Sequence, residues 1–192
     1  KFKGMMIETK KKLQKEKDAQ KRFQLSNLVS KYNNMQHNLK ITLNSAFGAM
    51  GNEHFRFFDQ RIAEAITTSG QLSIKWIEKE INRYLNSLLK TEEDKDFVVA
   101  VDTDSVYICM NDLVKKVFEG KEDDKNKVID FLDKVCSEQM EKIIDKSYQK
   151  LAKYMNAFDQ KMIMKRENLA DRALWTAKKR YIMNVYDSEG VR

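Results

Sequence analysis

No proline occurs anywhere in the 192 residues of this chain. Average usage of about 5% would give roughly ten prolines, and a proline inside a helix breaks or kinks it. The absence of proline therefore removes a major cause of helix breaks and favours long helices.

Three long helices are predicted by residue type and spacing. Residues 5–25 are rich in helix formers, and a break at Leu25-Ser26-Asn27 predicts a second helix with Ser26 or Asn27 as its N-cap. This second helix would run to about Ala49, so residues 1–50 would form an antiparallel helical hairpin. Between Asp59 and Leu89, apolar residues recur every three or four positions and predict an amphipathic helix with one buried face. They are Ile62, Ile66, Ile74, Ile77, Ile81, Leu85 and Leu88.

The rest of the chain mixes strands with helices. Residues 97–101 and 106–110 are rich in strand formers and flank the polar stretch D-T-D-S, a pattern typical of a β-hairpin. Charged loops are expected at 91–96 and 119–127, a helix at 128–156, and short strands at 162–164 and 179–185. Helices and antiparallel hairpins alternate without a regular βαβ order, so the predicted fold class is α+β, with residues 51–192 as a second region.

Composition narrows the possible functions. Residues 1–37 hold ten Lys/Arg and three Asp/Glu, so their net charge of +7 equals that of the whole chain. Residues 161–181 are basic again. Two basic regions suggest a polyanion contacted in two places, although a solvated helix face explains the first region equally well. The sequence contains no apolar run of membrane-spanning length, so no membrane partner is expected. Cys109 and Cys136 have no metal-binding spacing and are expected to be buried free thiols in a reducing cytoplasm.

Two carboxylates, Asp102 and Asp104, fall at the tip of the predicted hairpin. Carboxylates this close repel each other unless water or a cation intervenes, and Mg²⁺ commonly uses one or two carboxylates together with substrate phosphates. A surface turn is the ordinary alternative, because Asp and Ser favour turns. A metal-dependent nucleotide-sugar transferase is another user of a D-x-D pair. An EF-hand is excluded because the required Gly and Glu are missing.

A second group of chemically useful residues falls on one face of a predicted helix. Lys40, Asn44, Phe47 and Gly51 are spaced by four, three and four positions, and helical geometry aligns such positions. A cation, an amide, an aromatic ring and a glycine suit a phosphate beside a base. On chemistry alone, an ordinary helix of mixed residues remains an equal alternative.

The combination of motifs resembles the family B DNA polymerases. K-x-x-x-N-S-x-[YF]-G begins at Lys40, D-T-D-S begins at Asp102, and Trp175-Thr176-Ala177-Lys178-Lys179-Arg180-Tyr181 is similar to the family's K-K-R-Y segment. The intervening sequence is most similar to the T-even-phage branch, so we expect a chain from the cytoplasm of an infected host. The resemblance covers nearly all of this chain but a minority of a whole polymerase.

This resemblance implies that residues 1–50 are part of the fingers and residues 51–192 are the palm subdomain, and it implies roles for individual residues. Asp104 and Asp102 would bind the two catalytic Mg²⁺ ions of the palm subdomain, with Glu167 as a secondary acid. Lys40, Asn44 and Phe47 would contact the incoming dNTP from the fingers, and Lys3 would be a further triphosphate contact. The residues expected to hold the primer strand of primer-template DNA are Lys178, Lys179, Arg180 and Tyr181. Phe47 departs from the tyrosine more usual in the family, which puts hydrogen bonding at that position in doubt.

The resemblance also implies missing parts. The family's first metal-binding aspartate lies in a D-x-x-S-L-Y-P-S segment, and a chain without proline cannot contain that segment. The exonuclease domain, the thumb and part of the fingers are also not recognisable. The sequence starts with Lys1 within patterned sequence, and we expect a piece of a larger polymerase that is inactive without its remaining segments. A non-catalytic nucleic-acid-binding module stays open as an alternative.

Overall fold

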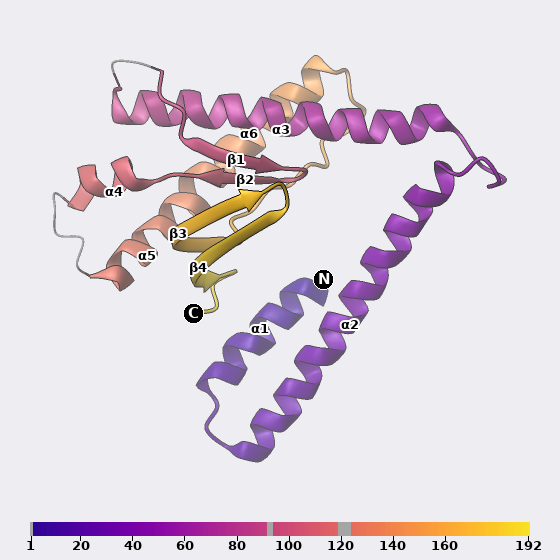
Figure 1. Ribbon diagram of the computed structural model, residues 1–192. Helices are drawn as coiled ribbons and strands as arrows, with labels where there is room; N and C mark the ends of the chain where they lie inside the picture. Colours follow the sequence, from indigo (N-terminus) through magenta and orange to yellow (C-terminus); the bar gives the residue numbers. More distant parts are fainter. Residues whose placement is uncertain (1, 92–93, 119–123) are drawn as a thin grey trace. The chain divides into compact units, whose positions relative to one another are not determined.

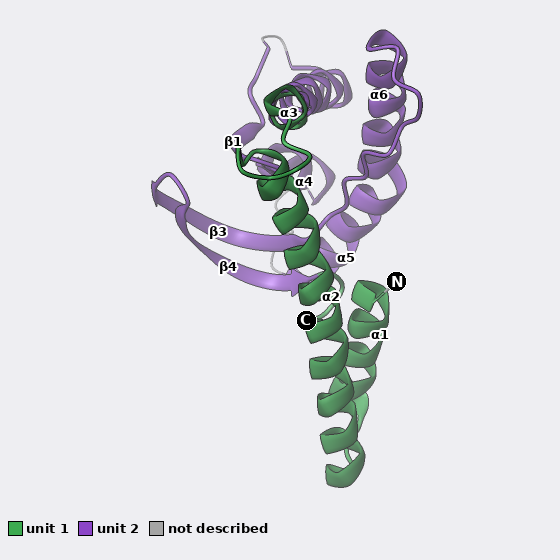
Figure 2. Cartoon of the chain, turned by 90° about the vertical axis from the view of Figure 1, so that its right-hand side faces the viewer, with its two compact units in different colours: residues 1–66, 189–192 green, residues 67–188 purple. Residues whose placement is uncertain are grey.

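The computed structural model describes residues 2–91, 94–118 and 124–192, and it divides into two compact units. Unit 1 comprises residues 1–66 and 189–192, and unit 2 comprises residues 67–188 (Figures 1 and 2). The division falls inside a helix, between Ile66 and Thr67, and not at residue 50. The assignment of fingers and palm to regions on either side of residue 50 stays a prediction.

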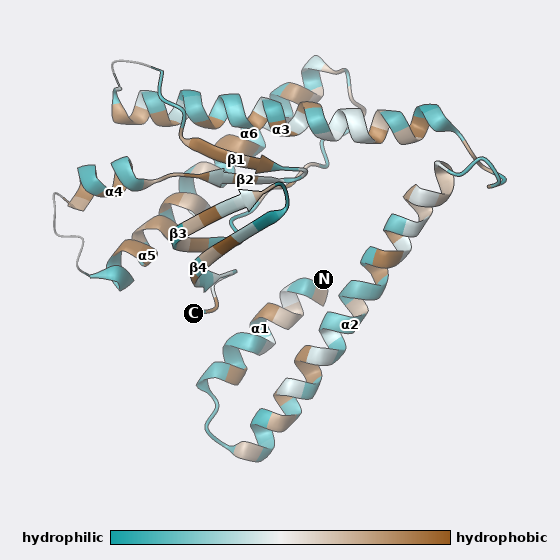
Figure 3. Ribbon diagram, viewed as in Figure 1, coloured by the Kyte–Doolittle hydropathy of each residue, from teal (hydrophilic) through white to brown (hydrophobic). Residues whose placement is uncertain are grey.

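Unit 1 is built on a helical hairpin. Helix α1 (Phe2–Lys15) runs antiparallel to helix α2 (Ala19–Met50), as Figure 1 shows, and buries Met6 and Thr9. No residue of α2 is buried, and polar and apolar residues are mixed along it (Figure 3). The predicted hairpin therefore forms, but most of the surface of its longer helix is exposed.

The predicted break at Leu25-Ser26-Asn27 is wrong, because these residues lie inside α2. The break is at residues 16–18, where the Asp18 carboxylate accepts a hydrogen bond from the Lys21 backbone at 2.9 Å and caps α2. The Glu16 carboxylate accepts from the backbone N–H groups of Lys17 and Asp18 at 3.0 and 3.1 Å. Such caps satisfy N–H groups that have no partner within the helix, and this fixes where the helix starts.

Unit 2 is organised around helix α3 (Gln60–Leu89), whose first turns belong to unit 1. The predicted apolar stripe is buried only within unit 2, where Ile77, Ile81 and Leu85 are at most 1% exposed. Ile62 and Ile66 are 46% and 47% exposed. Burial of such a side chain contributes about 1.5–3 kcal/mol, so the second half of α3 stabilises unit 2. The residues that complete this core are Phe97, Val98, Leu113, Val135, Met140, Ile144, Tyr148 and Leu151.

The remaining elements of unit 2 confirm the α+β prediction. Strands β1 (Val98–Asp102) and β2 (Ser105–Ile108) form one antiparallel sheet, and β3 (Asn168–Ala177) and β4 (Arg180–Ser188) form a second. Helix α4 (Asn111–Phe118) follows β2, and helices α5 (Lys125–Val135) and α6 (Glu141–Tyr154) precede β3. None of the described helices is long and apolar enough to cross a membrane.

Several predicted boundaries in unit 2 change. The helix expected at 128–156 starts earlier, at Lys125, and is interrupted by a π-helical turn, Cys136–Met140. No strand forms at 162–164, where the Gln160 side chain donates to the Met162 carbonyl at 2.8 Å. Strand β3 and helix α4 were not predicted. Of the expected charged loops, residues 92–93 and 119–123 lie outside the described residues.

Both cysteines are free, as predicted, but each is partly exposed and not fully buried. Burial raises the pKa of the Cys136 thiol to about 11. A thiol with this pKa is almost fully protonated at neutral pH, so Cys136 is a weak nucleophile.

Contacts at the base of β1 fix its position on α3. The Asn82 side chain accepts a hydrogen bond from the Phe97 backbone N–H at 2.9 Å and donates to the Asp96 carboxylate at 2.8 Å. Because Phe97 itself is buried in the core, the first sheet is held both by packing and by directed hydrogen bonds. The other end of this hairpin, the D-T-D-S tip, projects from a rigid support.

Candidate active site at the hairpin tip

The D-T-D-S tip is a two-residue turn. Asp102 ends β1 and pairs with Ser105 at the start of β2, so only Thr103 and Asp104 make the turn. Thr103 has a φ of 53°, and the Asp104 backbone N–H donates to the Asp102 carbonyl at 2.6 Å. A β-branched residue in the left-handed region is an outlier that costs about 1–3 kcal/mol. Such strain concentrates at functional sites, because the surrounding structure must maintain it.

The two carboxylates at the hairpin tip, Asp102 and Asp104, have different surroundings. The Thr103 hydroxyl donates to the Asp102 carboxylate at 3.0 Å and helps to orient it. The Asp104 side chain is exposed, and within residues 2–91, 94–118 and 124–192 its carboxylate forms no hydrogen bond or ion pair. The tip thus presents one oriented and one unpaired carboxylate.

A basic turn connects β3 to β4. Ala177 pairs with Arg180, which leaves Lys178 and Lys179 as the turn residues. Lys179 has a φ of 63°, and the Thr176 hydroxyl donates to the Arg180 carbonyl at 3.2 Å across the turn. Lys178, Lys179 and Arg180 are all exposed, so three cations are displayed within three residues.

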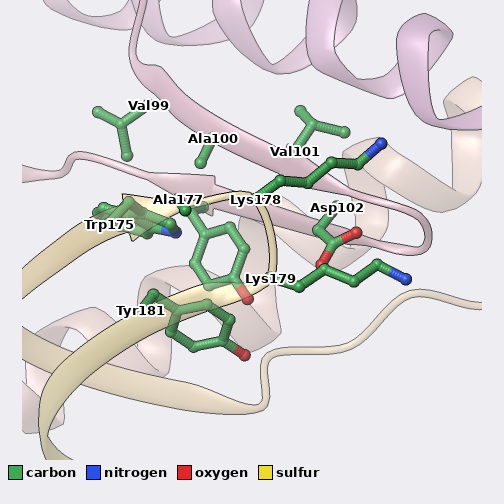
Figure 4. A pocket seen from close by; sticks show the side chains of 10 residues that line it. Val99, Ala100, Val101, Asp102, Trp175, Ala177, Lys178, Lys179 and Tyr181 are labelled. Atoms are coloured by element: carbon green, nitrogen blue, oxygen red, sulfur yellow. The ribbon is translucent and has the colours of Figure 1, made fainter.

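Asp102, at the carboxylate tip, and Lys178 and Lys179 of the basic turn line one hollow of about 330 Å³ (Figure 4). In Figure 4, the side chains of Asp102, Lys178 and Lys179 lie around the same opening, although they come from separate hairpins. The other residues that line this hollow are Val99, Ala100, Val101, Tyr107, Trp175, Ala177 and Tyr181. Anionic and cationic groups next to one cavity suit a ligand that carries both a bound cation and phosphates.

Three aromatic rings form one wall of the hollow. The Tyr107 ring packs edge-to-face against Trp175 and Tyr181, with centroid distances of 5.2 and 5.6 Å. A hydrogen bond with Tyr181, burial, and the charges of Tyr181, Asp102 and Glu167 raise the pKa of Tyr107 to about 12. Asp102 and Glu167 therefore both lie close enough to act on the Tyr107 hydroxyl.

Tyr107 and Trp175 were not predicted as site residues. Trp175 lies in the segment that resembles K-K-R-Y, and Tyr107 lies on β2 shortly after the carboxylates, but neither position carries a motif of its own. Only the contact between the two hairpins brings the rings together.

The nucleotide-binding candidates belong to unit 1. Lys40, Asn44 and Phe47 lie on α2 and are exposed, with Phe47 38% exposed. The spacing places them on one helix face. Helix α2 ends at Met50, and the N–H of its C-cap residue, Gly51, donates to the Phe47 carbonyl at 3.3 Å. Lys3 ion-pairs with Glu189, so a phosphate at Lys3 would have to displace this carboxylate.

The carboxylates present suit a magnesium ion shared with a substrate. Within the described part of the chain, no three His, Cys, Asp or Glu side chains gather closely enough to hold a metal on their own. Two carboxylates at one turn nevertheless match the way Mg²⁺ binds when phosphates and waters complete its coordination. Asp102 and Asp104 could therefore hold such an ion only together with ligands from outside this chain.

Comparison with known proteins gives one consistent result. The profile of DNA polymerase family B matches residues 5–128. A DNA-directed DNA polymerase of Escherichia phage RB69 is 44% identical over 165 residues, which cover 82% of this chain and 18% of the relative. For a DNA-directed DNA polymerase of Enterobacteria phage T4 the identity is 43% over 168 residues, covering 83% of this chain and 19% of the relative. The chain thus spans less than a fifth of the length of these relatives.

Proposed function

Because this chain belongs to the family B DNA polymerases, we propose that it supplies part of the fingers and most of the palm of a DNA-directed DNA polymerase. The observation that carries this proposal is the hollow in unit 2, where the carboxylate tip and the basic turn meet. Nucleotidyl transfer needs a primer 3′ end, a triphosphate and divalent cations at one place. A cavity bordered by the Asp102 carboxylate and by Lys178 and Lys179 has the chemistry to bind a primer end and a divalent cation.

Each acidic group at or near the hollow takes a role that its surroundings favour. Asp102 and Asp104 hold Mg²⁺, and the Thr103 hydroxyl keeps the Asp102 carboxylate oriented. When bound, Mg²⁺ would neutralise charge on the phosphates and support the leaving pyrophosphate. The negative charge of Glu167 contributes, with that of Asp102, to the raised pKa of Tyr107, and Glu167 acts as the secondary acid.

The basic turn binds the primer strand. Lys178, Lys179 and Arg180 are exposed and contact backbone phosphates, while Tyr181 packs against Tyr107 and holds the turn next to the tip. Phosphate contacts of this kind position DNA without reading its sequence. Binding should therefore depend strongly on salt and little on sequence.

The exposed face of α2 binds the incoming nucleotide. Lys40 supplies a cation for the triphosphate, Asn44 an amide, and Phe47 a ring for the nascent base pair. With 38% of its surface exposed, Phe47 has room to pack against a base. Among the described residues, the proposed metal ligands Asp102 and Asp104 come from only one hairpin. We therefore expect no DNA synthesis until the remaining polymerase segments provide the other metal ligands and the thumb.

The proposal is tested by binding to a labelled primer-template duplex, measured by fluorescence anisotropy across a salt series with and without Mg²⁺ and dNTP. We expect salt-sensitive binding that favours a recessed 3′ end and strengthens with Mg²⁺, without primer extension in the same samples. Equal binding to blunt duplex and primer-template, unaffected by Mg²⁺, would favour a non-catalytic nucleic-acid-binding module. Robust extension by the chain alone would contradict the expected inactivity.

A further inference from the structure

Arg166 lies in an irregular segment between α6 and β3 and is nevertheless largely enclosed. Its side chain is 11% exposed, whereas Ile163, three residues earlier, is 80% exposed. The long stretch from residue 157 to residue 167 contains no regular hydrogen-bonded structure. The point at which this stretch is attached to the rest of unit 2 therefore decides where β3 begins.

The guanidinium of Arg166 joins two other elements of unit 2. One terminal nitrogen pairs with Asp187 near the end of β4, and the other pairs with Asp133 on α5. The Arg166 backbone N–H donates to the Glu141 carboxylate at the start of α6, at 3.3 Å. Arg166 thus binds the irregular segment to β4 and to both helices that precede it.

Charge and burial make this contact difficult to replace. Asp187 is only 2% exposed, and a buried carboxylate is costly unless it is paired. Burial lowers the pKa of Arg166, but the hydrogen bonds of Asp187 and Asp133 outweigh this effect and raise it above the ordinary value. A planar guanidinium can bond two carboxylates in fixed directions, whereas a lysine ammonium is a point charge on a flexible stem.

The position of Arg166 in the sequence connects it to the site. The next residue is Glu167, whose charge, like that of Asp102, raises the pKa of Tyr107, a residue that lines the same hollow as Asp102. After Glu167 comes β3, which carries Trp175 and leads into the basic turn. An anchor at Arg166 restricts both Glu167 and the start of the hairpin that presents Lys178 and Lys179.

We propose that Arg166 is a positioning residue: its bonds to Asp133 and Asp187 fix Glu167 and the basic turn beside the carboxylate tip. The inference rests on the proposed function, because it assigns Arg166 to the cation site at Asp102 and Asp104. Arg166 touches neither cation nor DNA and acts through its neighbour. Outer residues that orient metal ligands typically change metal affinity by about 10–100-fold when they are replaced.

The test uses Mn²⁺ in place of Mg²⁺, because free Mn²⁺ can be measured by electron paramagnetic resonance in the presence of primer-template DNA. Arg166→Lys keeps the charge and loses the two-directional contact, and we expect the Mn²⁺ dissociation constant to rise about tenfold. Arg83→Lys is the matched control, since Arg83 pairs with Glu80 on α3 and is 73% exposed. This control should bind Mn²⁺ like the wild type.

A second variant keeps the test decisive if Arg166→Lys does not fold. Asp133→Asn removes one arm of the contact at a side chain that is 46% exposed, and it should give a smaller rise in the same dissociation constant. Circular dichroism must show each variant folded at the temperature used. Unchanged Mn²⁺ binding in both variants, with only the melting temperature lowered, would overturn the inference and leave Arg166 as a structural anchor.

The proposed function fails in a different way. Asp104→Asn should bind Mn²⁺ more weakly than the wild-type chain does. If Asp104→Asn binds Mn²⁺ as well as the wild type does, then the proposed cation site is wrong. The proposed role of Arg166 is then wrong as well. If that loss is seen and the Arg166 variants still match the wild type, only the positioning inference is overturned.

Discussion

Asp102 and Lys179 line the same hollow, although one lies at the tip of the β1–β2 hairpin and the other in the β3–β4 turn. The Tyr107 ring packs between these hairpins, against Trp175 and Tyr181. A carboxylate pair next to lysines could serve several ligands. Under the proposed function, a cation at the carboxylates and a primer end at the lysines account for both kinds of group.

The carboxylate tip is predicted to dominate cation binding. Replacing Asp104 with Asn removes a charged oxygen ligand and should weaken Mn²⁺ binding to the chain with primer-template DNA by at least about tenfold. Asp94→Asn is the control, because Asp94 is an exposed acid of the same unit outside the hollow. Equal losses in the two variants would mean that Mn²⁺ responds only to the overall charge.

The basic turn is predicted to supply phosphate contacts. Lys178→Met together with Lys179→Met should reduce the slope of log K against log salt by roughly two, since each phosphate contact contributes about 0.9. The change is measured by anisotropy with duplex DNA at several salt concentrations. Lys142→Met with Lys146→Met removes two exposed lysines of α6 and should leave the slope nearly unchanged. Identical slopes in both double variants would remove the turn from the DNA interface.

Thr103 offers a test of backbone strain. Its φ of 53° suits glycine better than any β-branched residue. Thr103→Gly should therefore be more stable than Thr103→Ala by about 1 kcal/mol, which reverses the usual order of these two residues in a strand. Urea unfolding followed by circular dichroism gives the comparison. An alanine variant at least as stable as the glycine variant would contradict the strained turn.

Tyr107 should make stability fall at high pH. Its pKa is raised to about 12 in the folded chain, against about 10 when exposed. Below pH 10 both states keep the proton, and the stabilisation is fully present. Between pH 10 and 12 the unfolded state loses the proton first, so this contribution to the free energy of unfolding decreases as pH rises.

The measurement for Tyr107 is tyrosinate absorbance at 295 nm during an alkaline titration. Tyr107→Phe should remove one late-titrating tyrosine. Tyr84→Phe is the matched control, since Tyr84 donates to Gln139 at 3.0 Å and lies outside the hollow. Loss of the late component in Tyr84→Phe and not in Tyr107→Phe would mean that the raised pKa belongs to another tyrosine.

Sequence patterns predicted the parts of unit 2 that are determined locally. The β1–β2 hairpin has two runs of strand formers with turn residues between them, and α3 has a regular apolar stripe. Strand β3 was not predicted because it is almost fully exposed and contains Ala, Asp and Arg where an apolar run would signal a strand. The break before α2 was misplaced because Ser26 and Asp18 are equally good N-caps by residue type.

The arrangement of the candidate site could not be read from spacing. The hairpins that carry Asp102 and Lys179 are distant in sequence, and no periodicity links them. Their contact depends on Tyr107 and Trp175. Tyrosine and tryptophan are as common in a protein core as at a functional site, so the residue types did not indicate this contact. The contacts of Arg166 could not be predicted either. Nothing in the basic residues 161–181 indicates which arginine pairs with Asp133 and Asp187.

A chimeric enzyme tests the central claim most directly. This chain would replace the matching segment of the phage RB69 polymerase, to which it is 44% identical, and primer extension would be measured with Mg²⁺ and dNTP. The account predicts extension by the chimera and a loss of roughly 100-fold with Asp104→Asn, while primer-template binding in the absence of Mg²⁺ is retained. A folded chimera that binds primer-template normally but does not extend it, or one whose synthesis is unaffected by Asp104→Asn, would contradict the account.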